Sequence, residues 1–182
     1  TMKKIILLLS LLSSSTIIYS QETEFKFVKE GFTDFVITQC EGKTQSELYK
    51  KALDWVSVTF KNPKEVIKAQ IENDYIRIEG SSKNLVCFNA MGKSCNTAKY
   101  NIEISFKDGK YKFDVINNIE YLYEAGWAEI RLDKTELYYN KKGEIRSAYK
   151  YFPEIADYFN NLNFELKEFL ISDKIPSKKS DW

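Results

Sequence analysis

The side chains best suited to chemistry in this sequence are carboxylates, because the 182 residues include no histidine. Histidine-based triads, histidine metal sites and histidine proton shuttles are therefore excluded. Two carboxyl groups held close together can carry out glycoside hydrolysis or general acid–base chemistry. Five acids occur at short intervals in one stretch: Glu120, Glu124, Glu129, Asp133 and Glu136. The same intervals are typical of a polar surface, which is the interpretation we favour, so we predict no catalytic residue.

The three cysteines are Cys40, Cys87 and Cys95, and none of them forms a C-x-x-C pair. Neither a zinc site nor a thioredoxin-type motif is indicated, and we predict no metal or cofactor. Cys87 and Cys95 lie in one stretch that reads as a loop, so a disulfide between them is plausible in an oxidising compartment. It would stabilise the fold by about 2–3 kcal/mol. The alternatives are that all three thiols are free or that Cys40 is one of the partners.

Aromatic side chains crowd into the stretch before the last predicted helix. The candidates for ligand binding are Tyr121, Tyr123, Trp127 and Tyr138, accompanied by Tyr139, Tyr149 and Tyr151. Exposed Tyr and Trp bury a large area on contact and lose few rotamers. The alternative, which we favour, is that these rings pack over a sheet edge and the helix ends. A third candidate is the segment 90–93, which would form a contact loop.

The N-terminus predicts export. Lys3 and Lys4 precede an apolar run, Ile5–Leu12, and a cluster of hydroxyl residues follows. This is the pattern of a cleavable signal peptide over residues 1–20, with the cut between Ser20 and Gln21. The alternative, an uncleaved membrane anchor, would need about 20 mostly apolar residues. We expect a periplasmic or secreted protein with no stable membrane anchor after cleavage.

The rest of the chain predicts one globular domain, residues 21–171, and a polar C-terminal tail, residues 172–182. The chain has 27 Lys and Arg and 26 Asp and Glu, and two of the lysines lie in the signal, which leaves a net charge of −1. A nucleic-acid-binding domain typically carries an excess of basic residues, which this nearly neutral chain does not have. Twelve Tyr, twelve Phe and three Trp supply a large buried area.

Two amphipathic helices and several alternating segments can be placed. Thr44 and Glu47 form a capping box that begins a helix, and Asn62-Pro63 ends it. Pro153 begins a second helix with apolar residues three and four positions apart. The predicted strands are Phe32–Thr38, Val66–Ile71, Tyr75–Gly80, Tyr100–Phe106 and Tyr111–Val115. Asp108-Gly109 joins the last two strands in a type I′ hairpin, whereas 81–97 and 121–127 read as loops.

The simplest packing is an α+β fold of order β-α-β-β-β-β-α. An antiparallel sheet of about five or more strands would carry both helices on one face. The strand residues predicted to face the helices are Ile76, Ile78, Tyr100, Ile102, Ile104, Phe106, Tyr111, Phe113 and Val115. The opposite face would carry Arg77, Glu79, Asn101, Glu103, Ser105, Lys107, Lys112 and Asp114.

Three segments form recognisable motifs: Leu48-Tyr49-x-x-Ala52-x-x-Trp55-Val56, Phe60-x-x-Pro63-x-x-Val66-Ile67 and the hairpin from Tyr100 to Tyr111. Together they resemble a family of secreted bacterial domains of unknown function with a TATA-binding-protein-like fold. The resemblance runs from Phe32 to Leu170 and implies half of a saddle, with two helices on one side. It implies no catalytic or ligand-binding residue.

The fold name alone does not indicate DNA binding. The predicted open face mixes both charge signs and lacks the apolar wedges of a minor-groove saddle, so we expect no nucleic acid partner. We therefore predict a non-enzymatic exported binding or interaction domain, whose partner is an unknown envelope protein, a peptide or a glycan. The alternatives are a hydrolase that uses paired carboxylates and a structural accessory subunit.

Overall fold

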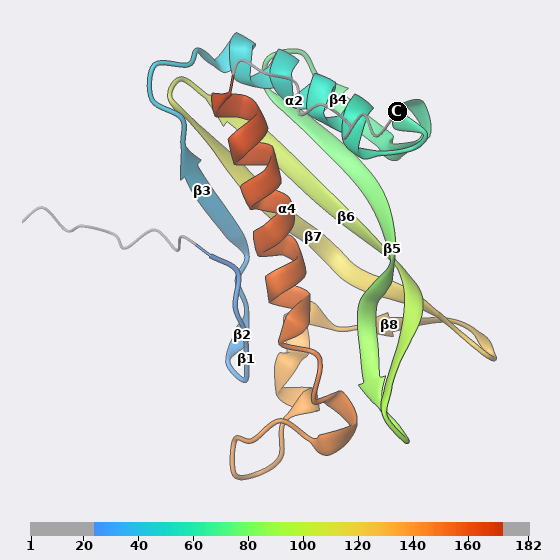
Figure 1. The fold of residues 1–182 in the computed structure, drawn as a ribbon. Coiled ribbons are helices and arrows are strands. Elements are labelled where there is room, and N and C mark those ends of the chain that lie inside the picture. The colour runs from blue at the N-terminus through green and yellow to red at the C-terminus, as the bar shows by residue number, and fades with distance from the viewer. Residues whose placement is uncertain (1–23, 173–182) are drawn as a thin grey trace, which may run out of the picture.

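Two long helices lie across one face of a twisted antiparallel sheet (Figure 1). The structure is a computed structural model and describes residues 24–172. The strands are β1 (Phe27–Val28), β2 (Gly31–Phe32), β3 (Phe35–Gln39), β4 (Ile67–Ile71), β5 (Tyr75–Asn89), β6 (Lys93–Lys107), β7 (Lys110–Tyr123) and β8 (Gly126–Ile130). The helices are α2 (Gln45–Thr59), α3 (Pro63–Val66) and α4 (Glu154–Ile171), with 3-10 turns η1 (Leu132–Tyr138) and η2 (Ser147–Tyr149).

The large sheet has the order β3-β7-β6-β5-β4, and β8 also pairs with β7. All of these pairings are antiparallel, and β1 and β2 form a separate small hairpin. The nine strand residues predicted to face the helices are all buried. The predicted α+β class is therefore confirmed, as are the two strands on either side of the Asp108-Gly109 turn.

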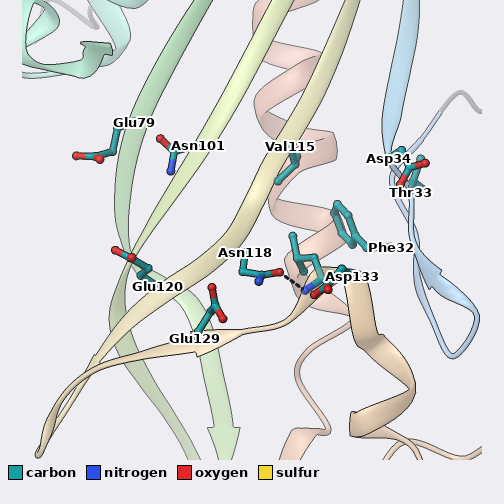
Figure 2. Close-up of a pocket in the computed structure, with 11 residues that line it drawn as sticks. Phe32, Thr33, Asp34, Glu79, Asn101, Val115, Asn118, Glu120, Glu129 and Asp133 are labelled. Carbon is teal, nitrogen blue, oxygen red and sulfur yellow. Dashed lines mark hydrogen bonds between the residues drawn. The ribbon is translucent and has the colours of Figure 1, made fainter. Parts of the chain in front are cut away.

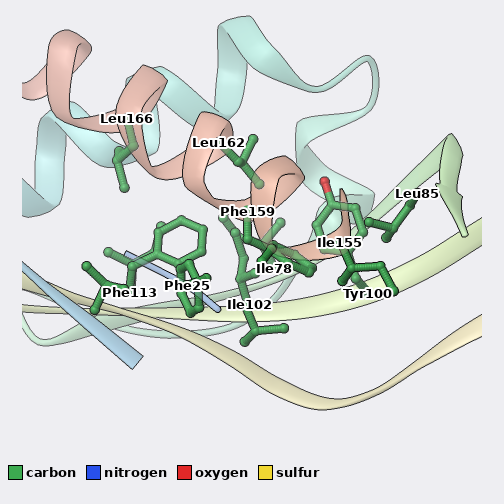
Figure 3. Packing of buried hydrophobic residues seen from close by; sticks show 14 of the residues in the cluster. Phe25, Ile78, Leu85, Tyr100, Ile102, Phe113, Ile155, Phe159, Leu162 and Leu166 are labelled. Atoms are coloured by element: carbon green, nitrogen blue, oxygen red, sulfur yellow. The ribbon is translucent and has the colours of Figure 1, made fainter. Parts of the chain in front are cut away.

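The ends of the helices follow the sequence signals. Thr44 caps α2 in a complete capping box, in which its side chain accepts from the Glu47 backbone N–H and the Glu47 carboxylate accepts from the Thr44 N–H. Pro153 immediately precedes α4. The α4 residues at helical spacing, which include Phe159 and Leu166, are buried against the sheet (Figure 3).

A small polar network is enclosed between α4 and the sheet. The Tyr111 hydroxyl donates to Asn163 Oδ1 at 2.7 Å, and Asn163 Nδ2 donates to Thr38 Oγ1 at 3.2 Å. All three side chains are buried. Because each polar group has a partner, burial costs little and the network fixes where α4 lies on the sheet.

Two predicted loops are strands, which corrects the sequence interpretation. Residues 81–97 continue β5 and begin β6, and only residues 90–92 form the turn between them. Residues 121–127 form the end of β7, a turn and the start of β8. The alternation was hidden by register shifts between Ser82 and Val86 and between Lys99 and Asn101. Each irregularity inserts two extra residues into one strand, which interrupts the pairing but leaves the later side chains on the face expected from alternation.

Aromatic rings close the end of the sheet away from the β6–β7 turn. Phe152 is fully buried, and its ring lies 4.9 Å from Tyr138, 5.0 Å from Tyr149 and 5.3 Å from Phe88. Phe27 of β1 joins the same cluster. The N-terminal hairpin, η1 and the start of α4 are thereby packed against β5.

Some predictions fall outside the described residues. They are the signal peptide over residues 1–20, the cut between Ser20 and Gln21, and all of the polar tail beyond Ser172. Within residues 24–172, no helix has the length and apolar character needed to cross a membrane.

Candidate functional site

The sheet face opposite α2 and α4 is the surface on which a site can form. Strand register places its side chains in rows across the sheet, because directly opposite residues share a face. One row runs Arg77, Glu103, Asp114 and Phe35 from β5 to β3. Each acid of this row has a basic partner: Arg77 donates to Glu103 at 2.9 Å, and Lys112 binds Asp114 at 3.0 Å. The centre of the face is therefore internally neutralised.

A hollow of about 610 Å³ opens where β7 changes partner strand (Figure 2). β7 pairs with β3 as far as Asp114 and with β8 from Ile119 onward, so residues 115–118 have neither neighbour on that edge. The Asn118 carboxamide oxygen bridges part of the gap by accepting from the Leu132 N–H at 3.0 Å. The lining is completed by Phe32, Thr33, Asp34, Glu79, Asn101, Val115, Glu120, Glu129 and Asp133.

Three of the five predicted acids line this hollow, namely Glu120, Glu129 and Asp133. Glu120 and Glu129 are directly opposite on β7 and β8. Glu124 and Glu136 do not line it, since Glu124 lies in the β7–β8 turn and Glu136 lies on η1. Asp34 and Glu79 bring further carboxylates from other parts of the chain. Glu79 was predicted on the open face, but nothing local in the sequence marks either acid as part of a site.

Basic side chains partly compensate these acids. Arg131 binds Asp133 with two hydrogen bonds, of 2.8 and 2.7 Å, and approaches Glu129 to 4.0 Å. The hydrogen bonds from Arg131 lower the pKa of Asp133. Lys99 lies opposite Glu120 on the neighbouring strand. Arg131 is itself held in place, because its backbone N–H donates to the Tyr138 hydroxyl at 2.7 Å.

Most of the residues that line the hollow are polar or charged, which suits it to binding polar groups. Glu120 and Glu129 are both exposed to solvent, whereas the general acid of a glycosidase is typically a carboxyl in a desolvated environment. Among residues 24–172, no group of three or more Cys, Asp or Glu is placed so that it could hold a metal ion.

The four aromatic candidates separate into two pairs. Tyr138 is only 7% exposed, and Tyr121 packs on Phe88 with ring centroids 5.3 Å apart, so both belong to the aromatic cluster. Burial raises the pKa of both phenols. Tyr123 is 55% exposed and Trp127 is 49% exposed, at the end of the β7–β8 hairpin. The structure thus brings two candidates to the surface and uses the other two for packing.

Trp127 has an apolar neighbour that the sequence analysis did not select. Leu122 lies directly opposite Trp127 and is 47% exposed. Both side chains are on the open face, because Leu122 is two residues from Glu120 on the same strand. Lys99 places its ammonium 4.4 Å from the centre of the Trp127 ring. This Leu122–Trp127 pair borders the acidic row of Glu120 and Glu129.

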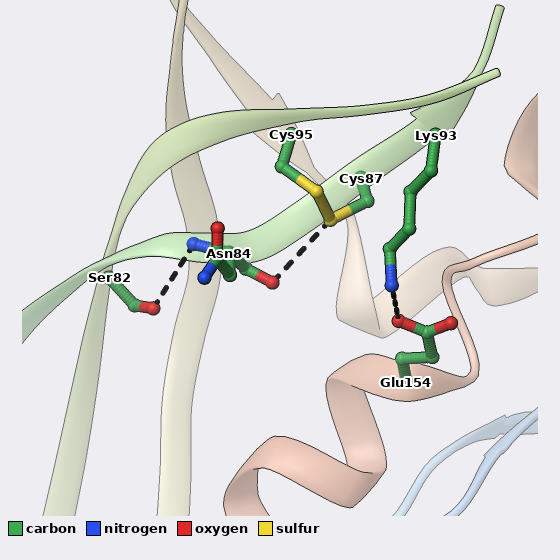
Figure 4. Close-up of a disulfide and its surroundings, with 6 residues drawn as sticks. All are labelled: Ser82, Asn84, Cys87, Lys93, Cys95 and Glu154. Atoms are coloured by element: carbon green, nitrogen blue, oxygen red, sulfur yellow. Dashed lines mark hydrogen bonds and ion pairs between the residues drawn. A yellow bond between two sulfur atoms is a disulfide. The ribbon is translucent and has the colours of Figure 1, made fainter.

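The structure contains a disulfide between Cys87 and Cys95 (Figure 4). The two cysteines are directly opposite on β5 and β6, so the bond joins two paired strands and not the irregular loop that was predicted. The same hairpin is tied to the start of α4, because Lys93 forms an ion pair with Glu154. Cys40 is a buried free thiol, and burial raises its pKa.

Comparison with known proteins identifies the central part of the chain. Residues 35–122 match the family model of a domain of unknown function (DUF4468) with TBP-like fold. The chain carries a DUF4468 domain. The matched residues run from the start of β3 to Leu122 near the end of β7. They therefore include Glu79 and Glu120 of the hollow, but not Trp127, Glu129 or Asp133.

Two solved structures are similar in fold to this chain. A DUF4468 family protein from Bacteroides ovatus is 16% identical, covers 80% of this chain and 90% of its own, and has a TM-score of 0.59. A TBP-like protein from Parabacteroides distasonis is 15% identical, covers 75% of this chain and 90% of its own, and has a TM-score of 0.54. At these identities the likeness shows the fold alone. No curated protein matches the chain.

Proposed function

We propose that this protein is an exported, non-enzymatic binding domain of the bacterial envelope that contacts its partner through the open sheet face. One observation carries the proposal: the half-exposed Leu122–Trp127 pair lies on the same face as the hollow and next to its acidic row. Apolar contact area beside polar, solvated groups is the composition of a recognition surface.

Trp127 would supply most of the contact energy. A tryptophan buries a large apolar area when a partner covers it, and few rotamers are lost. Lys99 beside the ring and Leu122 opposite it already restrict its orientation, which lowers the cost of ordering it on binding. The hollow would then accept polar groups of the partner, which is a protein segment, a peptide or a glycan.

Hydrolysis is the second candidate function, and it depends on one specific feature. Glu120 and Glu129 are directly opposite across an antiparallel pair, where Cβ atoms lie about 4.5–5.5 Å apart. Retaining glycosidases hold their two carboxyl groups about 5–5.5 Å apart. Because both acids are exposed and charged residues border them, we favour binding. A Glu120→Gln/Glu129→Gln variant that lost a measured hydrolytic activity would reverse this preference.

Site-specific photo-crosslinking tests the binding surface. A photoreactive phenylalanine analogue would replace Trp127 in one variant and Phe164 in a control variant. Phe164 is a matched control because it is 59% exposed and lies on α4, on the other side of the sheet. We expect one dominant adduct at position 127 that weakens when Leu122→Ala is added. Equal labelling at both positions, or none at 127, would contradict the proposal.

Export is tested separately. Cell fractionation and N-terminal sequencing of the protein from its own bacterium should find a chain that begins at Gln21 in the periplasm or the medium. Recovery of the processed or unprocessed chain in the cytoplasm would overturn the envelope assignment and leave the contact surface to be judged by the crosslinks.

A further inference from the structure

A second, smaller hollow lies at the opposite end of the open face, beside the β6–β7 turn. Its volume is about 230 Å³, and it is lined by Ile37, Ser105, Lys107, Lys110, Tyr111 and Lys112. Lys107 and Lys110 are directly opposite, as are Ser105 and Lys112. Along β6, Lys107 is eight residues from Lys99, which corresponds to roughly 25 Å. The hollow is therefore separate from the acidic one.

The positive charges of Lys107 and Lys110 lack compensating acids among the described residues, whereas the acids of the larger hollow have Arg131 and Lys99 beside them. Like charges directly opposite on neighbouring strands destabilise a sheet. Among residues 24–172, no ion pair joins Lys107 or Lys110 to an acid. Asp108, the acid in the β6–β7 turn, forms no ion pair with either lysine in the part of the chain that the structure describes; its carboxylate accepts a hydrogen bond from the Gln45 N–H at 2.8 Å.

The third lysine contributes its stem and not its charge. The Lys112 ammonium binds Asp114 at 3.0 Å and lies 5.3 Å from the centre of the Phe35 ring, one row away. Its methylene groups therefore face the hollow together with Ile37, which gives an apolar wall. Two ammonium groups and the Ser105 hydroxyl remain as donors at the rim.

We propose that this hollow binds a small anion that carries an apolar group, either a carboxylate or a phosphate ester. The anion would lie between Lys107 and Lys110 and remove their mutual repulsion, while the apolar group would pack on Ile37 and the Lys112 stem. The volume equals that of about eight water molecules, so the site takes a small ligand or the end group of a larger one. This site is independent of the proposed contact at Trp127.

Titrations with hexyl phosphate, hexanoate, inorganic phosphate and hexanol test the proposal. The protein is the chain from Gln21 onward, which contains every described residue, observed by amide NMR. We expect hexyl phosphate or hexanoate to shift the amides around Ile37, Ser105 and Lys110. Inorganic phosphate and hexanol alone should each bind at least about tenfold more weakly, since each lacks one half of the ligand.

Variants separate a binding role from a structural one. Lys107→Gln and Lys110→Gln should each weaken binding of the anionic probe by about tenfold without lowering the thermal midpoint of the free protein. Lys83→Gln is the matched control, because Lys83 is an exposed strand lysine outside the hollow. Inorganic phosphate that bound as well as hexyl phosphate, or equal losses for Lys83→Gln, would overturn the proposal. If the anion-site proposal failed in this way, the crosslinking result at position 127 would still stand.

Discussion

Gly80 shows how one residue on β5 is fixed by its cross-strand neighbour. Gly80 and Tyr100 are directly opposite, and the Tyr100 ring covers the space where a side chain would begin. A Cβ atom at Gly80 would lie 2.3 Å from the ring. The ring cannot easily move, because it is buried and its hydroxyl accepts from Tyr158 at 2.9 Å. The glycine is needed for space and not for an unusual backbone angle.

Gly80→Ala is therefore expected to destabilise the protein. Forcing extra atoms into a packed position costs about 1–3 kcal/mol, and urea unfolding measures the loss. Ser81→Ala, the next residue and exposed, should change stability by less than about 0.5 kcal/mol. Adding Tyr100→Leu should make Gly80→Ala less costly. An equal cost with and without the tyrosine would show that the contact is not the cause.

The capping box makes the stability of α2 depend on pH. Hydrogen bonds from the Thr44 backbone and side chain lower the pKa of Glu47 below its ordinary value of 4.5. A lowered pKa in the folded state means that the ionised carboxylate stabilises the fold above pH 4.5 and that this contribution is lost as the pH falls through the folded value. Unfolding of the native chain and of Glu47→Gln should therefore differ at pH 7 and converge at pH 3. A difference that persisted at pH 3 would contradict this origin.

Thr44→Ala removes the other half of the same box. Loss of an N-cap side chain costs about 1 kcal/mol, which thermal or urea unfolding at pH 7 would detect. Gln45→Ala, at the first helical residue, serves as the control because its side chain caps nothing in the described structure. If the two variants were equally stable, the cap would not be what begins the helix.

The Cys87–Cys95 disulfide links the two strands of the β5–β6 hairpin. The double variant Cys87→Ser/Cys95→Ser should unfold with a free energy lower by about 2–3 kcal/mol, the value for a bond that closes a short chain segment. The hairpin should still form, because Lys93 and Asn89 also tie it to Glu154 and Ser147. A reductant should lower the thermal midpoint of the native chain and leave that of the double variant unchanged. Equal effects on both would mean that the bond does not stabilise the fold.

Helices and simple hairpins could be predicted because their signals are local. The Thr44–Glu47 box, Pro153 and Asp108-Gly109 each act within a few residues. The ends of β5, β6 and β7 could not be predicted, because bulges near Ser82 and Lys99 interrupt the alternation on which strand assignment depends. Leu122 was missed because residues 121–127 were interpreted as a loop, although the alternation that begins at Tyr111 on β7 places Tyr121 inward and Leu122 outward.

The open face has a positive and a negative end, although the predicted mature chain is nearly neutral. Lys107 and Lys110 lie at one end, and Glu120 and Glu129 at the other. The acidic hollow joins Asp34 to Asp133, which are far apart in sequence. Such a site depends on which strands become neighbours. Composition gives the net charge, but only topology shows that the charges are separated.

The pairing of β3 with β7 also sets an order in which the fold can be completed. Phe35 of β3 lies opposite Asp114 of β7. The first strand of the large sheet to be synthesised, β3, therefore pairs with one of the last, β7. The hairpins β4–β5, β5–β6 and β6–β7 need no distant residue and can form early. Until they do, β3 has no strand to pair with, and the gap that becomes the acidic hollow has no wall on that side. We therefore expect the candidate site to be assembled late, when the segment with Phe32 and Asp34 meets β7 and β8.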